Sequence, residues 1–488
     1  MQFCALLAYI KLDDPPDSSK TNLNNHNPLS NVEPDQCDPY NLEFAAVILA
    51  AGKGTRMNSE LPKVLHRVCG RELLNLVIDA STSAGIHQTS VVIPENHPSF
   101  IEAIKGRANV SIQKTPKGTG HALISAREQV ESFRNVIVLN GDVPLISNTT
   151  LKKMMQNHLN NNAIITVLAC KVPNAEGLGR IIRNESGEFI SIVEEVDTDN
   201  YNRQIREINA GIYCFDSNWL WKAIKHVEPS KSGEIYITDL VALAQGEGKK
   251  IKSFMTLDQN EIKGINSKLD LSVVENIMNK IICEELMLKG VTILDPNTTY
   301  LDHGVTIGKD SIIHPNCHIR GSTNIGNRTT IGPNTIITNS QIGNDCNIFN
   351  SVIEETIMGN EVDVGPFSHT RSGTTLDNKV HIGNHAEIKN SNLGYGTKMG
   401  HFSYIGDAEV GCNVNIGAGA ITCNYDGVSK NRTTIKDGAF IGSDTMLIAP
   451  VKIGTKSSTG AGSIISKDVP DNSKAIGAPA RIIREAHD

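Results

Sequence analysis

Residues 306–332 read TIGKDSIIHPNCHIRGSTNIGNRTTIG, and this stretch decides the fold of the second half of the chain. A branched aliphatic residue followed by glycine recurs at Ile307, Ile325 and Ile331, at intervals of 18 and 6 residues. Further pairs of this kind continue as far as Ile453. A six-residue period is typical of a parallel β-helix, in which three repeats close a coil and each aliphatic side chain stacks on its equivalent in the next. The pattern predicts such a coil.

The six-residue spacing fails twice, over residues 343–364 and 417–441. We expect a loop to leave the coil at each break, and loops on a rigid scaffold are where sites are often built. One coil cannot bury its flat flanks alone, so we expect several copies to pack side by side. The spacing does not give the number of copies.

Upstream of the coil the pattern changes to that of an α/β domain. Short apolar runs, AAVILAA at 45–51, TSVVIP at 89–94, NVIVLN at 135–140 and AIITVLAC at 163–170, alternate with amphipathic stretches. This alternation predicts a mostly parallel, Rossmann-like sheet flanked by helices over residues 44–267. Apolar side chains at Val274, Ile277, Ile281 and Leu288, with Gly290 as a stop signal, predict a linker helix over 268–290. The coil domain then occupies 291–488.

Composition excludes several classes of function. The formal net charge is -7, so no global positive field attracts nucleic acid or an anionic membrane. No apolar run is long enough for a membrane span. The ten cysteines are scattered without a CxxC pair, which favours free thiols in the cytoplasm. Residues 1–43 are polar and lack both periodicity and a secretory pattern, so we expect a disordered or loosely attached extension.

The apolar run AVILAAGKGTRM at 46–57 ends in a glycine-rich, cationic turn. It is neither a P-loop nor a dinucleotide fingerprint, because Lys53 precedes Gly54 and Met57 stands where the third glycine would be. The backbone N–H groups of this turn, with Lys53 and Arg56, can form an anion-binding nest. The turn alone leaves nucleotide binding and a plain tight turn equally open.

Three further segments favour a nucleotide site. PKVLH at 62–66 adds Lys63, and QKTPKGTGHAL at 113–123 adds a second small-residue turn before a helix. VIVLNGDVPLI at 136–146 places Asp142 at the end of a buried strand, where open α/β sheets bind ligands. A single aspartate there is more often a cap or turn residue. With two glycine-rich turns and two lysines nearby, a site for a hard cation is the better interpretation.

These motifs resemble those of a known family. LAAGKGTRM followed by PKVLH is similar to the sugar-nucleotide pyrophosphorylases. The whole of residues 44–480 resembles the bifunctional N-acetylglucosamine-1-phosphate uridylyltransferase/glucosamine-1-phosphate acetyltransferases, with GDVPLIS, YITD, GDAEVG, NVNIGAG and TCNYDG in the family's order. The resemblance implies a nucleotidyltransferase domain, a linker helix and a left-handed β-helix that acts as an acetyltransferase. The implied substrates are glucosamine-1-phosphate, N-acetylglucosamine-1-phosphate, UTP and acetyl-CoA.

For uridylyl transfer the resemblance implies three groups of residues. Arg56 and Lys63 would meet the phosphates, and Asp142 and Asn266 would carry Mg²⁺. The nucleotide and the sugar would be bound by Leu49, Ala50, Ala51, Gly52, Gln113, Gly118, Thr119, Gly179, Glu194, Asn209, Tyr236 and Thr238. Without the resemblance, Glu194 and Asn209 would be read as a hairpin and a strand end. The reaction needs mainly positioning and neutralisation of charge.

For acetyl transfer the resemblance implies His401, in KMGHFSYIGDAEVG, as general base. An ordinary imidazole titrates near pH ~6.5 and can take a proton from the sugar ammonium group. A lone histidine in a coil is otherwise usually structural. The implied contacts to the sugar phosphate are Arg371, Lys389, Tyr404 and Asn415, and those to acetyl-CoA are Ala418, Asn424, Tyr425, Ser443 and Ala461. The family also implies a homotrimer with acetyl-transfer sites between chains, so acetyl transfer should require the trimer.

The sequence departs from the family's pattern at two positions, and two alternative functions remain open. Asn140 replaces an aromatic residue of some relatives, and Arg481 is a weak counterpart of the family's coenzyme-binding arginine. The chain could instead be a single-activity nucleotidyltransferase with a structural coil, which Arg371, Lys389 and His401 argue against. It could also be a non-catalytic relative, which would be expected to lack Lys63, Asp142 or Asn266.

Overall fold

The computed structural model describes residues 43–483 except 53, 96 and 231–232. The extension predicted for 1–43 lies outside the described residues apart from Glu43, and so does Lys53. Among the residues that are described, no helix is both long and apolar enough to cross a membrane.

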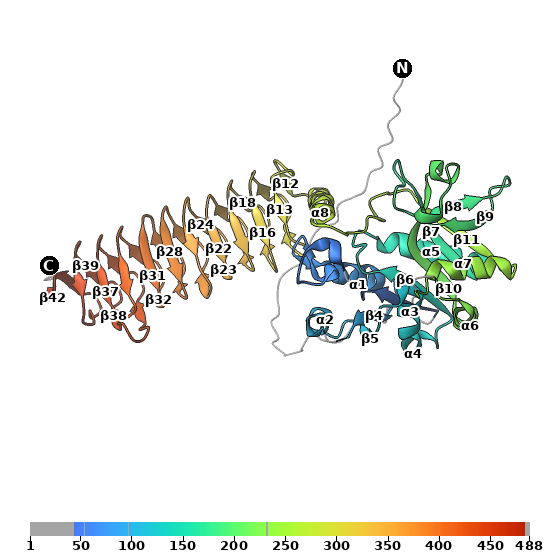
Figure 1. The fold of residues 1–488 in the computed structure, drawn as a ribbon. Coiled ribbons are helices and arrows are strands. Elements are labelled where there is room, and N and C mark those ends of the chain that lie inside the picture. The colour runs from blue at the N-terminus through green and yellow to red at the C-terminus, as the bar shows by residue number, and fades with distance from the viewer. Residues whose placement is uncertain (1–42, 53, 96, 231–232, 484–488) are drawn as a thin grey trace, which may run out of the picture. The chain divides into compact units, whose positions relative to one another are not determined.

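The first part contains the predicted sheet (Figure 1). Its strands, in spatial order, are β11 (Ile251–Thr256), β7 (Ile165–Lys171), β10 (Glu207–Asp216), β6 (Asn135–Asn140), β1 (Phe44–Leu49), β4 (Gln88–Pro94) and β5 (Asn109–Gln113). β8 (Arg180–Arg183) pairs with β10 and with β9 (Phe189–Val193). In the seven-strand order only β10 runs antiparallel to its neighbours, β6 and β7, and the added strands β8 and β9 also pair antiparallel. No α-helix lies between β7 and β10, and a parallel connection needs such a crossover.

Helices cover both faces of this sheet. They are α1 (Leu73–Ser83), α2 (Pro98–Ile104), α3 (Gly118–Ser125), α4 (Arg127–Val130), α5 (Asn148–Asn161), α6 (Ser217–Ala223) and α7 (Ile237–Gly246). Successive side chains of β1 alternate between two cores. Ile48 packs in one cluster with Leu74 of α1 and Met154 of α5, and Val47 packs in the other with residues of α3 and α7. A strand buried on both faces reads as a continuous apolar run, as β1 does.

Helix α8 (Lys268–Leu288) confirms the predicted helix. Ser267 caps it: its Oγ accepts from the Asp270 N–H, and Asp270 accepts from the Ser267 N–H at 2.8 Å. Not all of the apolar residues that predicted the helix are buried in it. Val274 is buried, but Leu288 is 88% exposed, and Cys283 and Leu286 enter the coil core instead.

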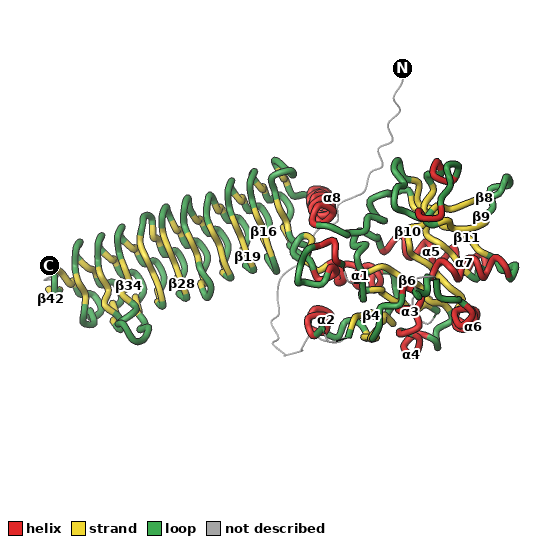
Figure 2. The backbone as a smooth tube through the Cα atoms, in the orientation of Figure 1, coloured by secondary structure: helices red, strands yellow, loops and turns green. Residues whose placement is uncertain are grey.

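The second part is a coil of short parallel strands on three faces (Figure 2). The first face contains β12 (Thr292–Ile293), β15 (Ile312–Ile313), β18 (Thr330–Ile331), β21 (Asn347–Ile348), β24 (Asp363–Val364), β27 (His381–Ile382), β30 (Lys398–Met399), β33 (Asn415–Ile416), β36 (Phe440–Ile441), β39 (Ser458–Thr459), β41 (Lys474–Gly477) and β42 (Ala480–Ile483). The second face contains β13 (Tyr300–Leu301), β16 (His318–Arg320), β19 (Ile336–Thr338), β22 (Val352–Glu354), β25 (His369–Thr370), β28 (Ala386–Lys389), β31 (Ser403–Gly406), β34 (Ile421–Cys423), β37 (Met446–Ile448) and β40 (Ile464–Ile465). The third face contains β14 (Thr306–Ile307), β17 (Asn324–Ile325), β20 (Gln341–Ile342), β23 (Thr356–Met358), β26 (Thr374–Leu376), β29 (Asn392–Leu393), β32 (Ala408–Val410), β35 (Thr433–Ile435) and β38 (Val451–Ile453).

The predicted aliphatic stacks are present. Ile307 is in register with Ile325, and Ile325 with Ile342, all of them buried in one core that runs the length of the coil. Each such side chain stabilises the fold by about 1.5–3 kcal/mol through burial. The first part and this left-handed β-helix of hexapeptide repeats are the predicted fold class.

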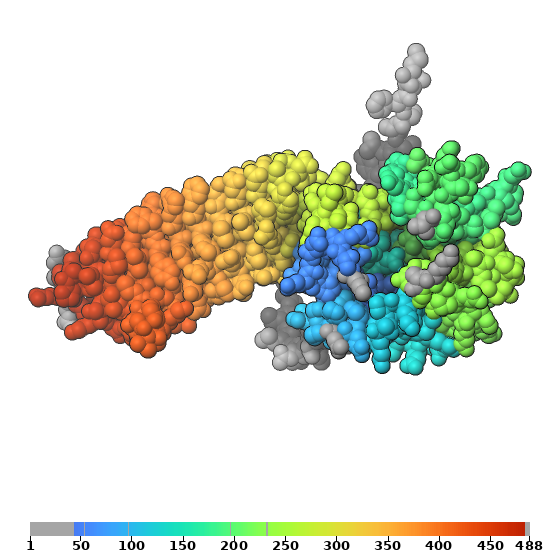
Figure 3. Space-filling model, in the orientation of Figure 1, coloured from blue at the N-terminus to red at the C-terminus, as the bar shows by residue number. Residues whose placement is uncertain are grey.

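One predicted loop is present and the other is not. Residues 424–432 leave the coil between β34 and β35, within the second break in spacing, and Figure 3 shows the coil surface bulging at this loop. Over 343–364 the prediction was wrong, because β21–β24 continue the coil there. Ile342 pairs with Met358, only 16 residues away, so this turn of the coil is shorter and a fixed six-residue period misses it.

Candidate active sites

The first candidate site lies where β1 and β6 end side by side. The Gly141 N–H donates to the Leu49 carbonyl at 2.9 Å, which places Asp142 next to the turn that follows β1. A cavity of about 560 Å³ opens over this point. Its lining includes most of the residues predicted to hold the nucleotide: Leu49, Ala50, Ala51, Gly52, Lys63, Gln113, Gly118 and Thr119.

Four polar side chains converge beside this cavity. Lys63 forms an ion pair with Asp142, and its Nζ also donates to the Asn266 Oδ1 at 3.2 Å. Arg56 donates to the same Asn266 oxygen at 3.0 Å. The Ile265 N–H donates to the Asp142 carbonyl, which holds the segment before α8 against the end of β6. A carboxylate, a carboxamide oxygen and two cationic side chains from four separate segments thus meet in one place.

A second cavity, of about 710 Å³, shares Leu49, Thr119, Asn140 and Tyr236 with the first. Glu194, Asn209 and Thr238 line it. Burial raises the pKa of Glu194, and the neighbouring carboxylates of Asp197 and Asp239 raise it further. Gly179 lies outside the lining, but its carbonyl accepts from the Asn209 N–H at 2.9 Å. The two cavities form one continuous recess.

Gly118 shows why the second turn needs glycine. Its φ is +89°, and a Cβ there would lie 2.4 Å from the Ile235 carbonyl oxygen. This close approach lets the Ile237 N–H donate to the Thr119 Oγ1 at 3.1 Å. The start of α3 is therefore tied to the start of α7, which carries Thr238.

The second candidate site lies on the second face of the coil. Arg371 follows β25, Lys389 ends β28 and Tyr404 lies in β31, so three adjacent coils each contribute one side chain. Arg371 donates to Glu387 at 2.9 Å, and this hydrogen bond raises the pKa of the guanidinium group. The pKa of Lys389 is lowered by Lys430 and, to a smaller extent, by Arg371. The three cations are therefore close together.

His401 and Asn415 do not lie on that face. His401 is an exposed residue at the corner between β30 and β31, and Asn415 lies in β33 on the first face. The corner is open, since Phe402 is 58% exposed. Within one chain the structure brings Arg371, Lys389 and Tyr404 together, with His401 at their edge.

The residues predicted to bind acetyl-CoA form a column and a loop. The Ala418 carbonyl accepts from Asp444 N–H at 2.7 Å, and the Ser443 carbonyl accepts from Gly462 N–H at 2.8 Å. Ala418, Ser443 and Ala461 thus occupy equivalent corners of successive coils. Asn424 and Tyr425 begin the loop 424–432, and Tyr425 is 62% exposed. Arg481 lies apart in β42, opposite Ile476.

Sequence reasoning missed two residues at this site, Lys430 and Asp407. Lys430 lies in the loop 424–432, whose course back towards Lys389 is not encoded in any period. Asp407 is 8% exposed and stands in the GDAEVG motif, which was noted without a role for the aspartate. Acidic residues such as Asp345 and Glu355 also occupy coil corners at positive φ, so the residue type alone gave no signal.

Comparisons with known proteins agree with this geometry. A family model described as nucleotidyl transferase matches residues 45–263, and one described as bacterial transferase hexapeptide matches 304–339. The chain is 44% identical to the bifunctional protein GlmU of Carboxydothermus hydrogenoformans, over 90% of this chain and 98% of that protein. It is 42% identical to that of Clostridioides difficile and 40% identical to that of Streptococcus agalactiae, each over 91% of this chain and 97% of the relative.

Fold and sites define a two-part transferase, in which a nucleotidyl transferase is joined to a hexapeptide-repeat acyltransferase. The chain belongs to the GlmU family of bifunctional proteins. It is a bifunctional enzyme of UDP-N-acetylglucosamine synthesis that acetylates glucosamine-1-phosphate and then transfers a uridylyl group to the product. The relatives match both parts over nearly their whole length, so a structural coil or a non-catalytic relative is not favoured.

Proposed function

We propose that the continuous recess at the ends of β1 and β6 binds UTP in the 560 Å³ cavity and N-acetylglucosamine-1-phosphate in the 710 Å³ cavity. The observation that carries this proposal is the contact of Lys63 with both Asp142 and Asn266 beside the 560 Å³ cavity. In-line attack of the sugar-phosphate oxygen on the α-phosphorus of UTP needs the two substrates held end to end. Two cavities that share four lining residues provide that arrangement.

The charges in the recess match this reaction. Lys63 and Arg56 would neutralise the phosphates, while Glu194 and Asn209 would accept and donate hydrogen bonds to the sugar. Mg²⁺ fits the donor set, because the Asp142 carboxylate and the Asn266 carboxamide oxygen both reach the one ammonium group of Lys63, which marks where a cation is stabilised. When bound, Mg²⁺ would neutralise charge that develops on the phosphates. Among the described residues no group of three or more His, Cys, Asp or Glu could hold a metal by itself, so substrate oxygens would complete the site.

For acetyl transfer, Arg371 and Lys389 would bind the phosphate of glucosamine-1-phosphate, and Tyr404 and Asn415 would orient the sugar. His401 would take a proton from the sugar ammonium group, and the free amine would attack the acetyl thioester. The backbone N–H near Ala418 would stabilise the oxyanion, a contribution of roughly 3 kcal/mol per donor in other enzymes. The C–S bond then breaks, and the departing thiolate of coenzyme A takes up a proton. The Ala418, Ser443 and Ala461 column would hold the coenzyme arm.

A trimer would complete the acetyl-transfer site. The outward row of the second face is apolar at Ile336, Val352, Ile421 and Met446, and Ile464 is 39% exposed. The equivalent row of the third face is mostly polar, for example Thr306, Asn324 and Gln341. An apolar row on one face of a rigid coil favours packing against other copies. Arg371, Lys389 and Tyr404 lie on this same face, so a neighbouring copy would border the site.

We also propose the domain division 44–267, 268–290 and 291–488. A cytoplasmic location is supported by the eight described cysteines, all of which are free.

Assaying each half reaction with and without Mg²⁺ tests the metal assignment. Chelation by EDTA should abolish uridylyl transfer and leave acetyl transfer within about twofold, because the imidazole chemistry at His401 uses no metal. Uridylyl transfer that persists after chelation would contradict the assignment of Asp142 and Asn266. Loss of acetyl transfer on chelation, reversed by added Mg²⁺, would contradict a metal-free site at His401.

A further inference from the structure

Asp407 lies at a corner of the coil between β31 and β32, 8% exposed, and its backbone has a φ of 51°. Its carboxylate accepts two hydrogen bonds from carboxamides on the adjacent coils. The Asn390 Nδ2 donates to Oδ1 at 2.6 Å, and the Asn424 Nδ2 donates to Oδ2 at 2.5 Å. The Asp407 carbonyl also accepts from the Thr433 N–H at 3.2 Å. Asp407 therefore holds both ends of the loop 424–432, through Asn424 at one end and Thr433 at the other.

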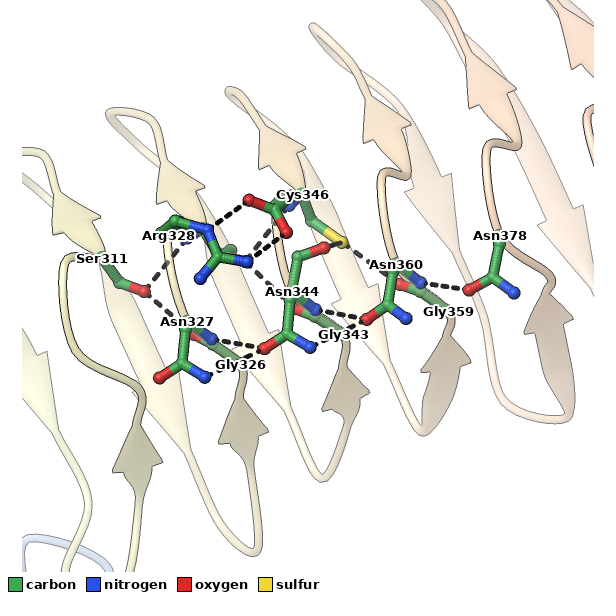
Figure 4. A network of polar contacts seen from close by, with 12 residues as sticks. Ser311, Gly326, Asn327, Arg328, Gly343, Asn344, Cys346, Gly359, Asn360 and Asn378 are labelled. Atoms are coloured by element: carbon green, nitrogen blue, oxygen red, sulfur yellow. Dashed lines mark hydrogen bonds and ion pairs between the residues drawn. The ribbon is translucent and has the colours of Figure 1, made fainter. Parts of the chain in front are cut away.

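Another corner of the same coil shows what asparagines do without a carboxylate. Asn327, Asn344, Asn360 and Asn378 form a ladder (Figure 4). The Asn327 Nδ2 donates to the Asn344 Oδ1 at 3.3 Å, and the Asn344 Nδ2 donates to the Asn360 Oδ1 at 3.1 Å. Every carboxamide of that ladder points the same way along the coil. At the Asp407 corner the direction reverses, because Asn390 and Asn424 both donate towards Asp407.

The reversal follows from chemistry rather than from packing. An ionised carboxylate only accepts hydrogen bonds, so a carboxamide on either side must turn its NH₂ towards it. The Asn424 Oδ1 is then directed away from Asp407. Within the described part of the chain, no hydrogen bond reaches this oxygen. An asparagine at 407 would instead donate to position 424 and allow the Asn424 carboxamide to turn round, as in the Asn327 ladder.

We propose that Asp407 is a positioning residue for acetyl transfer, which fixes the Asn424 carboxamide so that its oxygen is presented as an acceptor for an amide N–H of the pantetheine arm of acetyl-CoA. This inference rests on the proposed binding of acetyl-CoA at Asn424. It assigns to Asp407 a control of coenzyme affinity and not of the amino-sugar substrate, since Arg371 and Lys389 hold the phosphate of the latter.

The test compares steady-state constants of five variants of the full-length chain with acetyl-CoA and glucosamine-1-phosphate as substrates. Asp407→Asn should raise KM for acetyl-CoA about tenfold, the size of one lost hydrogen bond with a misdirected donor in its place. KM for glucosamine-1-phosphate and the rate of uridylyl transfer should stay within about twofold. Asp345→Asn is the matched control, because Asp345 also occupies a coil corner at positive φ (58°) but lies away from the loop. It should change neither constant.

A charge swap separates orientation from general loss of structure. Asn424→Asp alone sets two carboxylates against each other and should raise KM for acetyl-CoA more than Asp407→Asn does. In the double variant Asp407→Asn/Asn424→Asp, the new carboxamide can donate to the new carboxylate, whose second oxygen remains an acceptor for the coenzyme. Its KM should return to within about threefold of the unmodified enzyme.

The outcomes are distinguishable. If Asn424→Ala leaves KM for acetyl-CoA unchanged, the coenzyme site itself is misplaced and the inference falls with it. If Asn424→Ala raises this KM but Asp407→Asn does not, only the positioning role of Asp407 is overturned. If Asp407→Asn also loses uridylyl transfer, the double variant Asp407→Asn/Asn424→Asp decides between the two explanations. Recovery of acetyl-CoA affinity in the double variant supports the orientation role, and no recovery contradicts it.

Discussion

The sheet region and the coil position their functional side chains by different means. In the sheet region, strand ends and the turns after them surround a recess within one chain, and Lys63 contacts both Asp142 and Asn266 beside it. In the coil, the core is filled by stacked aliphatic side chains, so functional groups lie on the outside at faces and corners. His401 and Tyr425 are accordingly exposed. A recess can serve as a site in a single chain, whereas an outer face needs a neighbour to enclose its substrates.

The largest expected effect comes from replacing the His401 imidazole, which should affect the activity of the coil and leave that of the sheet region intact. His401→Ala should lower acetyl transfer about thousandfold, the middle of the range for loss of a general base. Uridylyl transfer should stay within about twofold, because His401 is in the coil and outside both cavities of the recess. Separate assays of the two half reactions measure both effects. Loss of both activities in a protein that remains folded would break the comparison.

The reciprocal change is Asp142→Ala. Uridylyl transfer should fall about hundredfold, since the change removes a proposed metal ligand and leaves Lys63 without its ion-pair partner. Acetyl transfer should be unaffected. The matched control, Asp258→Ala, removes an aspartate of the same region that lies outside the linings of both cavities. An Asp142→Ala enzyme that keeps full uridylyl transfer would show that the recess is not the site.

A third change sharpens the role of neighbouring copies. Ile336→Glu places a charge on the apolar row of the second face, far along the coil from His401, and should dissociate the proposed trimer. Acetyl transfer should then fall at least tenfold at dilute protein concentration, while uridylyl transfer persists. Gln341→Glu on the third face is the control and should change neither the oligomeric state nor the rate of acetyl transfer. Sedimentation with parallel assays measures the effect, and a monomer that acetylates at the normal rate would contradict a shared site.

The smallest expected effect concerns stability and pH. His158 is buried in the sheet region beside Thr166, and burial lowers its pKa to about 4. The unfolded chain takes up this proton below pH ~6.5, so the sheet region should lose up to about 3 kcal/mol as pH falls from 6.5 towards 4. Both tryptophans lie in α6, so urea unfolding followed by tryptophan fluorescence reports on this region alone. His158→Gln should flatten the dependence, and an unchanged slope in that variant would rule out His158 as its source.

The two regions also differ in how far their sequences predict them. The coil follows from the Ile–Gly period, because identical stacking requirements recur on every turn. The prediction failed over 343–364, where Ile342 and Met358 stack across a turn shortened to 16 residues. A fixed six-residue period predicts which side chains fill the core, but it cannot predict a turn of the coil that is shorter than the others. The linker helix was predicted from its spacing, but not the choice of Cys283 and Leu286 over Leu288 as its contacts with the coil core.

The same limit applies to the sites. Strand ends in a parallel sheet meet at one edge, so the position of Asp142 beside the turn after β1 was predictable. The position of Lys430 was not, because it depends on how the loop 424–432 folds, and the role of Asp407 was not, because it depends on contacts with that loop. That loop is held by Asp426, which accepts from the Ser429 and Val428 N–H groups and whose pKa is lowered to about 2 by these hydrogen bonds. Such local bonding leaves no periodic signal.

The most direct test of the division into two sites is a crystal structure of the enzyme with a uridine nucleotide and coenzyme A both bound. We predict uridine above the end of β1 beside Gln113, and coenzyme A along the Ala418, Ser443 and Ala461 column next to His401, bordered by a second copy of the chain. Coenzyme A bound elsewhere, or a uridine site outside the recess, would contradict the account.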